Sequence, residues 1–135
     1  MKQTVTNHGV GKWVTRKFDE EKAAGTLRYA DDLRFGPELL HARAARSTIA
    51  HGEIVSIDVS EAMKVPGVVK VITGDMFVHH FGLYLQDRTP LAVGKVRYVG
   101  EPIALVVAET EEAAEEGMLK VKATYRELPA VFDPV

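Results

Sequence analysis

One carboxylate in this 135-residue sequence stands where it could do chemistry. Glu101 lies between Gly100 and Pro102, directly before the apolar run Ile103–Ala108. Such a residue could be a catalytic acid, or it could accept hydrogen bonds that hold a turn. Because no base, nucleophile or metal motif accompanies it, we predict a structural role. Gly100 and Pro102 would set the turn, and Glu101 would cap backbone N–H groups or contact a partner.

Two pairs of adjacent side chains, Asp31-Asp32 and His79-His80, could suggest a metal site. Neighbouring residues on an extended backbone point to opposite faces, so neither pair suits chelation. The sequence also contains no His-Glu-x-x-His motif and no spacing typical of a centre with two histidines and one carboxylate. We therefore expect a turn at the aspartates and a loop at the histidines. We expect no catalytic group, no metal and no cofactor in this chain.

Composition excludes several classes of function. The sequence has no cysteine, so it cannot supply a disulfide, a thiolate nucleophile or cysteine ligands for zinc or iron–sulfur clusters. A net charge of -2, with both signs spread along the chain, predicts no nucleic-acid partner. The longest uncharged apolar run is far shorter than the ~20 residues that span a bilayer, and no secretory signal opens the chain. We expect a cytoplasmic protein without a membrane partner.

The pattern of apolar residues, with the placement of glycine and proline, predicts mainly strands. The run 103–108 is uncharged and rich in β-branched residues, which indicates a strand buried on both faces in the middle of a helix-covered sheet. The fold class predicted is α+β, a mixed sheet with a few short helices packed on it. Strands are expected over residues 26–30, 39–47, 54–57, 68–72, 103–108 and 121–125. The sequence leaves the relative direction of the strands at 54–57 and 68–72 open.

Helices are expected in three places. A short charged turn should end near Gly25, and Asp58 with Glu61 three residues later forms a capping-box pattern for a second, short helix. Thr110 is the predicted cap of a third helix, whose buried face is unusually small. Gly117 on that face predicts that the helix packs closely on a sheet.

The length predicts a single domain over residues 1–135. Residues 1–19 lack periodicity, and they are either an extended arm that docks on a surface or a partly disordered terminus. Residues 76–94 are predicted to be a long loop. Loops of this length are usually functional or disordered, and the aromatic content of this one argues against simple disorder.

Several motif-bearing stretches follow one another in a set order across nearly the whole chain. They include Val10-Gly11-Lys12, Tyr29–Leu33, Lys95–Pro102 with its Gly-Glu-Pro motif, and Tyr125–Val131. Together they resemble the N-terminal α/β-hammerhead domain of the molybdenum hydroxylases. That family includes xanthine dehydrogenase, aldehyde oxidase and the carbon monoxide dehydrogenase large subunit. The resemblance implies the α/β-hammerhead fold.

The resemblance also implies an oxidoreductase in which molybdopterin-bound molybdenum hydroxylates a substrate with oxygen from water. Electrons would leave through iron–sulfur clusters, commonly to FAD. The family's pterin-binding segments and its catalytic glutamate lie in later domains, and none of them maps onto this sequence. We therefore expect a non-catalytic hammerhead domain or small subunit that packs against a separate molybdopterin-binding domain, with iron–sulfur and FAD subunits as further partners. The alternative is a free-standing protein-binding module that kept the fold without hydroxylase activity.

Three origins stay open for the chain: a separately encoded subunit, a split gene and an isolated domain. An initial Met1 favours a complete reading frame. For docking on the partner, we expect the aromatic loop and the Gly-Glu-Pro region to contribute. The predicted docking residues are Phe77, Phe81, Tyr84, Arg97, Tyr98, Gly100 and Glu101.

Overall fold

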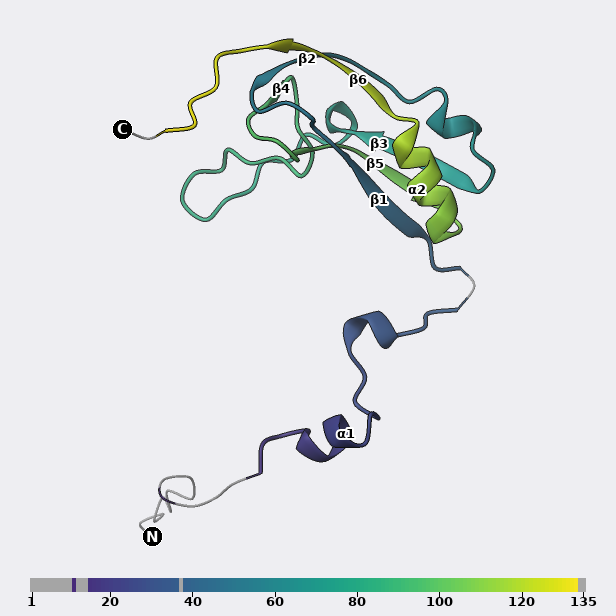
Figure 1. Ribbon diagram of the computed structural model, residues 1–135. Coiled ribbons are helices and arrows are strands. Elements are labelled where there is room, and N and C mark those ends of the chain that lie inside the picture. The colour runs from purple at the N-terminus through teal and green to yellow at the C-terminus, as the bar shows by residue number, and fades with distance from the viewer. Residues whose placement is uncertain (1–10, 12–14, 37, 134–135) are drawn as a thin grey trace. The chain divides into compact units, whose positions relative to one another are not determined.

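The computed structural model describes residues 11, 15–36 and 38–133 (Figure 1). The chain divides into two units, Met1–Gly36 and Pro37–Val135. One α-helix and one 3-10 helix belong to the first unit, and the other elements of the described chain belong to the second. Most of the predicted N-terminal arm, residues 1–19, lies outside the described residues.

The first unit contains two short helical elements. Helix α1, Asp19–Ala23, matches the predicted charged turn, and none of its residues is buried. The 3-10 helix η1, Ala30–Asp32, occupies the predicted aspartate turn. The strand predicted for residues 26–30 is wrong. The N–H of Tyr29 donates to the Asp32 carboxylate at 2.9 Å, so a local turn satisfies a group that a strand would have paired with a neighbour.

The second unit is built from two three-stranded sheets, and strand β5 is the centre of the first. β5 (Pro102–Ala108) lies between β1 (His41–Arg46) and β3 (Val68–Thr73), and both pairings are antiparallel. The apolar run that follows the Gly-Glu-Pro motif is therefore a central strand, as predicted.

The second sheet is smaller, because one of its edge strands has only two residues. β2 (Gly52–Asp58) lies between β4 (Lys95–Val96) and β6 (Lys122–Glu127), again with antiparallel pairings. Successive strands β2 and β3 thus belong to different sheets, which settles a relation that the sequence left open. The predicted α+β class, with few and short helices, is confirmed.

The two faces of β5 differ in how deeply they are buried. Ala104 and Val106 are fully buried, whereas Leu105 and Val107 on the other face are half-buried. Val106 of β5 and Val96 of β4, in the second sheet, are the largest fully buried side chains among the described residues. They belong to one apolar cluster, which joins the two sheets. The prediction of burial on both faces therefore holds fully for one face only.

Helix α2, Glu111–Leu119, packs on the first sheet. The Thr110 hydroxyl accepts a hydrogen bond from the Ala113 N–H at 3.1 Å, which confirms the predicted cap. Gly117 is buried, and a β-carbon there would lie 2.8 Å from Cγ1 of Val106. The predicted close packing is confirmed, because the helix axis can approach β5 this closely only where the side chain is missing.

The predicted helix after β2 is a single 3-10 turn, η2 (Ala62–Lys64). The capping box predicted for Asp58 and Glu61 is wrong. Asp58 accepts a hydrogen bond from the Ser60 N–H at 2.9 Å, and Glu61 pairs with Lys64 at 2.6 Å. A capping box needs the third position of an α-helix, which a single 3-10 turn does not offer.

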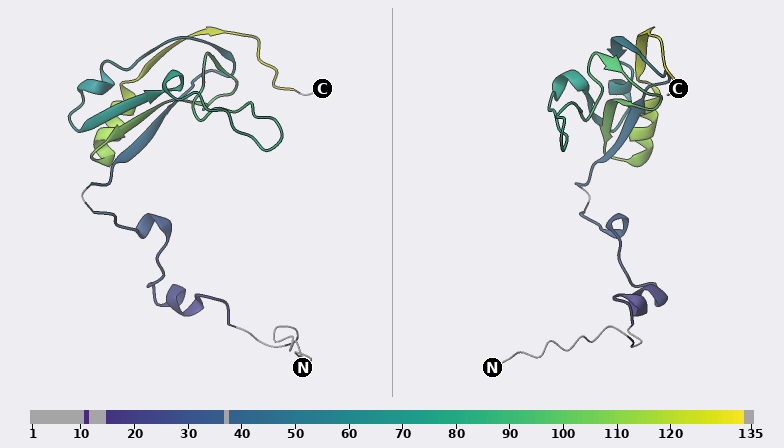
Figure 2. Two further views of the ribbon diagram at one scale, coloured as in Figure 1. Left: turned by 180° about the vertical axis from the view of Figure 1, so that it is seen from behind. Right: turned by 90° about the vertical axis from the view of Figure 1, so that its left-hand side faces the viewer.

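A long connection joins β3 to β4. It opens with the 3-10 helix η3 (Gly74–Met76), and further on one antiparallel bridge joins Phe81 to Arg88. The loop predicted for residues 76–94 lies in this segment. Figures 1 and 2 show that this connection and the C-terminal segment both project from the end of the second unit that is opposite α2.

Candidate docking surface

The Gly-Glu-Pro motif forms the turn that leads into β5. Gly100 has a φ of +87°, in the region that favours glycine, and Pro102 is the first residue of the strand. The Gly100 N–H donates to the Ser47 carbonyl at 2.8 Å, and the Ser47 N–H donates to the Glu101 carbonyl at 2.9 Å. These two bonds join the turn to the end of β1.

The Glu101 carboxylate is used within this turn. It accepts a hydrogen bond from the Arg97 N–H at 2.5 Å, and its other oxygen lies 3.9 Å from Nη1 of the same arginine. Only 13% of the Glu101 side chain is exposed. The predicted role in capping a backbone N–H is confirmed, and the geometry explains why a carboxylate stands between Gly100 and Pro102.

The second sheet also contacts the residue that holds this turn, Ser47. Tyr125 of β6 is half-buried and belongs to the side chains packed around the core. Burial raises the pKa of the Tyr125 phenol, and a hydrogen bond with the Ser47 side chain acts in the opposite direction. Ser47 therefore contacts both the Gly-Glu-Pro turn and the second sheet, which gives the turn a rigid support.

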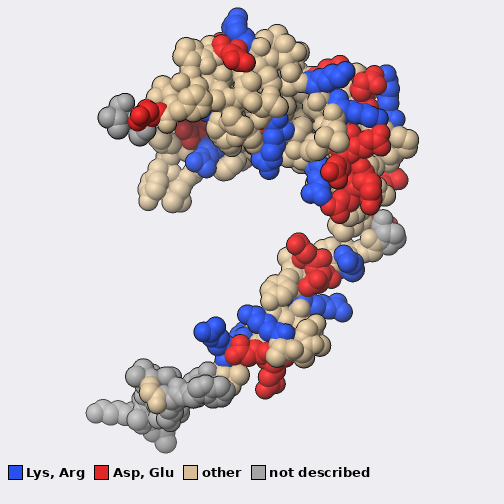
Figure 3. All heavy atoms as spheres, viewed as in Figure 1, with Lys and Arg blue, Asp and Glu red and all other residues tan. Residues whose placement is uncertain are grey.

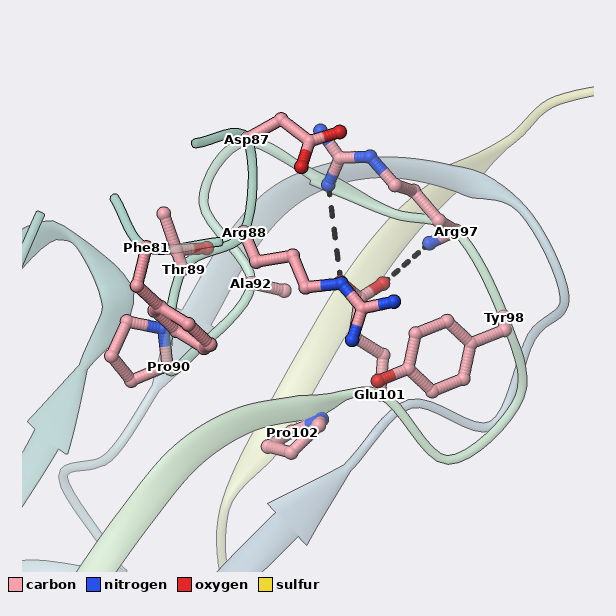
Figure 4. Close-up of a pocket in the computed structure, with 10 residues that line it drawn as sticks. All are labelled: Phe81, Asp87, Arg88, Thr89, Pro90, Ala92, Arg97, Tyr98, Glu101 and Pro102. Carbon is pink, nitrogen blue, oxygen red and sulfur yellow. Dashed lines mark hydrogen bonds and ion pairs between the residues drawn. The ribbon is translucent and has the colours of Figure 1, made fainter. Parts of the chain in front are cut away.

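A pocket of about 520 Å³ opens beside the turn (Figure 4). The Arg88 side chain reaches across it towards Tyr98 and Glu101. Its guanidinium makes no hydrogen bond or ion pair with any residue that the structure describes. The pocket is lined by Phe81, Asp87, Arg88, Thr89, Pro90, Ala92, Arg97, Tyr98, Glu101 and Pro102.

A second recess of about 390 Å³ lies between residues 97–99 and the C-terminal segment 129–132. His51 holds that segment: its carbonyl accepts from the Leu128 N–H at 3.0 Å, and its Nδ1 lies 2.7 Å from the Pro129 carbonyl. Arg97 and Tyr98 line both recesses. The two recesses therefore meet at these residues and form one continuous surface.

A narrow projection stands next to the first pocket, and we call residues 81–88 the 81–88 finger. Two backbone hydrogen bonds close its base. The Phe81 N–H donates to the Arg88 carbonyl at 2.8 Å, and the Arg88 N–H donates to the Phe81 carbonyl at 3.2 Å. Its tip carries Leu83, Tyr84 and Leu85, which are 89%, 92% and 73% exposed. Three consecutive large apolar side chains are thus presented to solvent by a closed turn.

The structure brings together some of the predicted docking residues and separates others. Phe81, Arg97, Tyr98 and Glu101 line one pocket, and Gly100 shapes the turn below it through its backbone. Tyr84 lies at the tip of the finger, and Phe77 lies against the ring of His79, with 6.1 Å between the ring centroids. Whether any of these residues contacts a partner stays a prediction.

Sequence reasoning missed other members of this surface. Leu83, Leu85 and Arg88 of the finger were not predicted, nor were Val131 and Phe132 of the C-terminal segment, which are both exposed. A signal for the finger was present, because an apolar triplet between Gly82 and the charged pair 87–88 is unusual in a loop. The neighbourhood of the C-terminal segment had no such signal, since it depends on the chain returning to residues 97–99.

The described residues do not fit the binding of a metal centre. They contain no group of three or more His, Asp, Glu or Cys side chains placed to hold an ion, and the sequence has no cysteine. In the described part of the chain, no helix is both long enough and apolar enough to cross a bilayer. This surface is suited to contact with another protein, because exposed apolar and aromatic side chains surround Arg88 and Arg97.

Comparison with known proteins identifies the fold family. A model of the family described as "Aldehyde oxidase and xanthine dehydrogenase, a/b hammerhead domain" matches residues 24–129. The chain belongs to this family. The match confirms both the resemblance seen in the sequence and the α/β-hammerhead fold, and it includes the Gly-Glu-Pro turn and the finger.

Three relatives show the extent of the similarity. The hammerhead domain is 38% identical to the gamma subunit of the 6-hydroxypseudooxynicotine dehydrogenase complex of Paenarthrobacter nicotinovorans, over 93% of this chain and 17% of that subunit. It is 36% identical to the nicotinate dehydrogenase large molybdopterin subunit of Eubacterium barkeri, over 83% of this chain and 27% of that subunit. The structure of reconstituted CO dehydrogenase from Oligotropha carboxidovorans matches with a TM-score of 0.84 and 31% identity, over 92% of this chain and 16% of that one.

The hammerhead domain is therefore much shorter than these relatives. It spans between 16% and 27% of their lengths. Most of each relative has no counterpart in this sequence.

Proposed function

We propose that this hammerhead domain is a non-catalytic component of a molybdopterin-dependent hydroxylase, and that its loop end packs against the molybdopterin-binding part of the enzyme. The observation that carries the proposal is the uneven distribution of exposed apolar side chains. Large apolar residues of the finger, of residues 98–99 and of residues 131–132 are exposed around two adjoining recesses. Exposed apolar surface of this kind marks an interaction site.

The opposite end of the second unit has a different surface. In Figure 3, acidic and basic side chains gather over the α2 end, whereas most of the loop end on this face is uncharged. On α2 the glutamates are exposed, and Arg43 of β1 forms an ion pair with Glu111. A charged, solvated end and an apolar end support a single docking direction within this unit.

Cofactor chemistry belongs to the partner in this proposal. The name of the Eubacterium barkeri relative includes molybdopterin. We infer that molybdopterin and molybdenum, with iron–sulfur clusters and FAD, serve the assembled enzyme, and that this domain supplies shape and support. A cytoplasmic location and further iron–sulfur and FAD subunits remain part of the proposal.

Co-expression tests the proposal directly. The chain is produced together with the molybdopterin-binding polypeptide encoded in the same genome, and the mixture is separated by size-exclusion chromatography with light scattering. We expect a complex whose mass equals the sum of the two proteins. Separate elution of two folded proteins would contradict the proposal and would favour a free-standing binding module.

A further inference from the structure

The 81–88 finger is a closed turn, and its backbone conformation depends on one glycine. Gly82 has a φ of +156°, and a β-carbon at this position would overlap the Leu85 carbonyl oxygen. Backbone bonds between Phe81 and Arg88 close the base. The turn can therefore form only with glycine here, and what the turn achieves is the exposure of the apolar tip.

We propose that the finger is the principal docking element of this domain: Leu83, Tyr84 and Leu85 enter an apolar recess of the molybdopterin-binding part, and Arg88 pairs with a carboxylate beside that recess. This inference rests on the proposed function and adds to it the contacting element and the chemistry of the partner's surface. Aromatic residues and arginine are enriched at such interfaces, and a few of them carry most of the binding free energy.

The charge of Arg88 supports a carboxylate on the partner. Figure 4 shows two arginines at the pocket, Arg88 and Arg97. Arg97 lies within ion-pair distance of Glu101, and the Asp87 carboxylate lies on its other side in the same view. The Arg88 guanidinium has no hydrogen-bonded or ion-paired acceptor among the described residues, so its charge is available for a carboxylate from outside the chain.

The choice of partner follows from the surroundings of the finger. Between 73% and 84% of each relative's chain lies outside the part that matches this domain, so an extensive protein surface exists for the finger to contact. The pocket at the base of the finger is continuous, through Arg97 and Tyr98, with the recess at the C-terminal segment.

The test compares finger variants in the binding of the co-expressed molybdopterin-binding polypeptide, measured by biolayer interferometry. We expect the triple change Leu83→Ser, Tyr84→Ser and Leu85→Ser to raise the Kd at least about 100-fold, because the apolar anchors are removed. The matched control is Leu119→Ser, at a position that is 74% exposed on α2, and it should leave the Kd unchanged. Urea unfolding of each variant checks that the fold is intact, since all four side chains lie at the surface.

Arg88 is tested by its salt dependence. Arg88→Gln should raise the Kd about tenfold at low salt and flatten its dependence on ionic strength, whereas Arg88→Lys should keep most of that dependence. If the wild-type chain binds and the triple variant binds equally well, the finger proposal is overturned while the proposed function stands. If the wild-type chain does not bind at all, both fail. If the triple variant instead abolishes a homodimer of this chain, the partner assigned to the finger is wrong.

Discussion

Helix α2 and the 81–88 finger both depend on a glycine, but they use it in opposite ways. Gly117 removes a side chain so that α2 can approach Val106, and the helix turns small residues inward and glutamates outward. Gly82 lets the backbone make a tight turn that turns large apolar residues outward. The first glycine serves the domain's own core, whereas the second serves a surface that the domain does not itself cover. The difference separates what this unit needs for folding from what it offers for binding.

The Gly-Glu-Pro turn lies between these two regions and serves both. Through Ser47 it is bonded to the end of β1, and through Glu101 it holds the backbone of Arg97. Arg97 and Tyr98 in turn line both recesses of the docking surface. The stretch that leads into the central strand therefore connects the core to the candidate interface.

The largest effect is expected where α2 meets β5. Gly117→Leu should lower the free energy of unfolding by about 3 kcal/mol, because the new side chain must displace Val106 and Val68 in a packed core. Urea denaturation followed by circular dichroism measures the change. The control on the same helix is Glu115→Leu, at an exposed position, which should change stability by less than about 0.5 kcal/mol. Equal effects at the two positions would show that close packing is not the reason for the glycine.

The next effect is expected at Glu101. Glu101→Ala should lower the free energy of unfolding by about 2 kcal/mol, because the Arg97 N–H loses a charged acceptor whose side chain is only 13% exposed. Glu101→Gln keeps an oxygen acceptor and should cost about half as much. Partner affinity is measured separately on the same proteins. If neither variant alters stability or affinity, the hydrogen bond does not explain the motif.

A smaller global effect is expected at Gly82, because the finger lies outside the core. Gly82→Ala should lower the free energy of unfolding by only about 1 kcal/mol, since the strain can be released by local opening. Amide hydrogen exchange at Phe81 and Arg88 should nevertheless become at least about tenfold faster, because the backbone bonds at the base are lost.

Gly94→Ala is the control for this experiment. Gly94 also has a positive φ, of +68°, but a β-carbon there would meet no atom within 4 Å. Its replacement adds backbone strain without overlap, so protection at the base of the finger should persist. Unchanged exchange in Gly82→Ala would mean that the finger does not need glycine for its shape.

The smallest effect concerns pH. Hydrogen bonds from Ser60 lower the pKa of Asp58, and the hydrogen bond and charge of Lys64 lower the pKa of Glu61, while Glu61 raises the pKa of Lys64. A carboxyl with a lowered pKa in the folded state stabilises the protein at neutral pH, and this contribution is lost as the pH falls through that lowered pKa. The contribution of Lys64 is present below its unfolded pKa and is lost only as the pH rises through its raised folded pKa.

The double variant Asp58→Asn, Glu61→Gln tests this pH dependence. At pH 7 and low salt it should be slightly less stable than the wild type, and the difference should shrink as the pH is lowered towards 3, because the wild-type carboxyls take up protons. Addition of salt should also shrink the difference, because the pair of Glu61 and Lys64 is exposed. Urea unfolding at the two pH values provides the comparison, and a difference that grows towards pH 3 would contradict the assigned direction of the shifts.

Local patterns predicted several elements of this domain correctly. The apolar run 103–108 lies in the central strand, and Thr110 caps a helix. Glu101 accepts a hydrogen bond from a backbone N–H. Each of these depends on interactions within a few residues or on burial that the residue types themselves require. The predicted strand at 26–30 failed because a strand requires a distant partner, and nothing local in its sequence showed whether one was available.

The sequence by itself determined the family, the central strand and the absence of metal-binding motifs, because these follow from residue order and local chemistry. Only the tertiary structure decided that β2 and β3 lie in different sheets, that Arg88 reaches across the pocket at Tyr98 and Glu101, and that the C-terminal segment returns to residues 97–99. Such relations depend on pairing between distant parts of the chain, and many pairings are compatible with one hydrophobic pattern. The docking surface belongs to this second group, since its residues come together only after both sheets have formed.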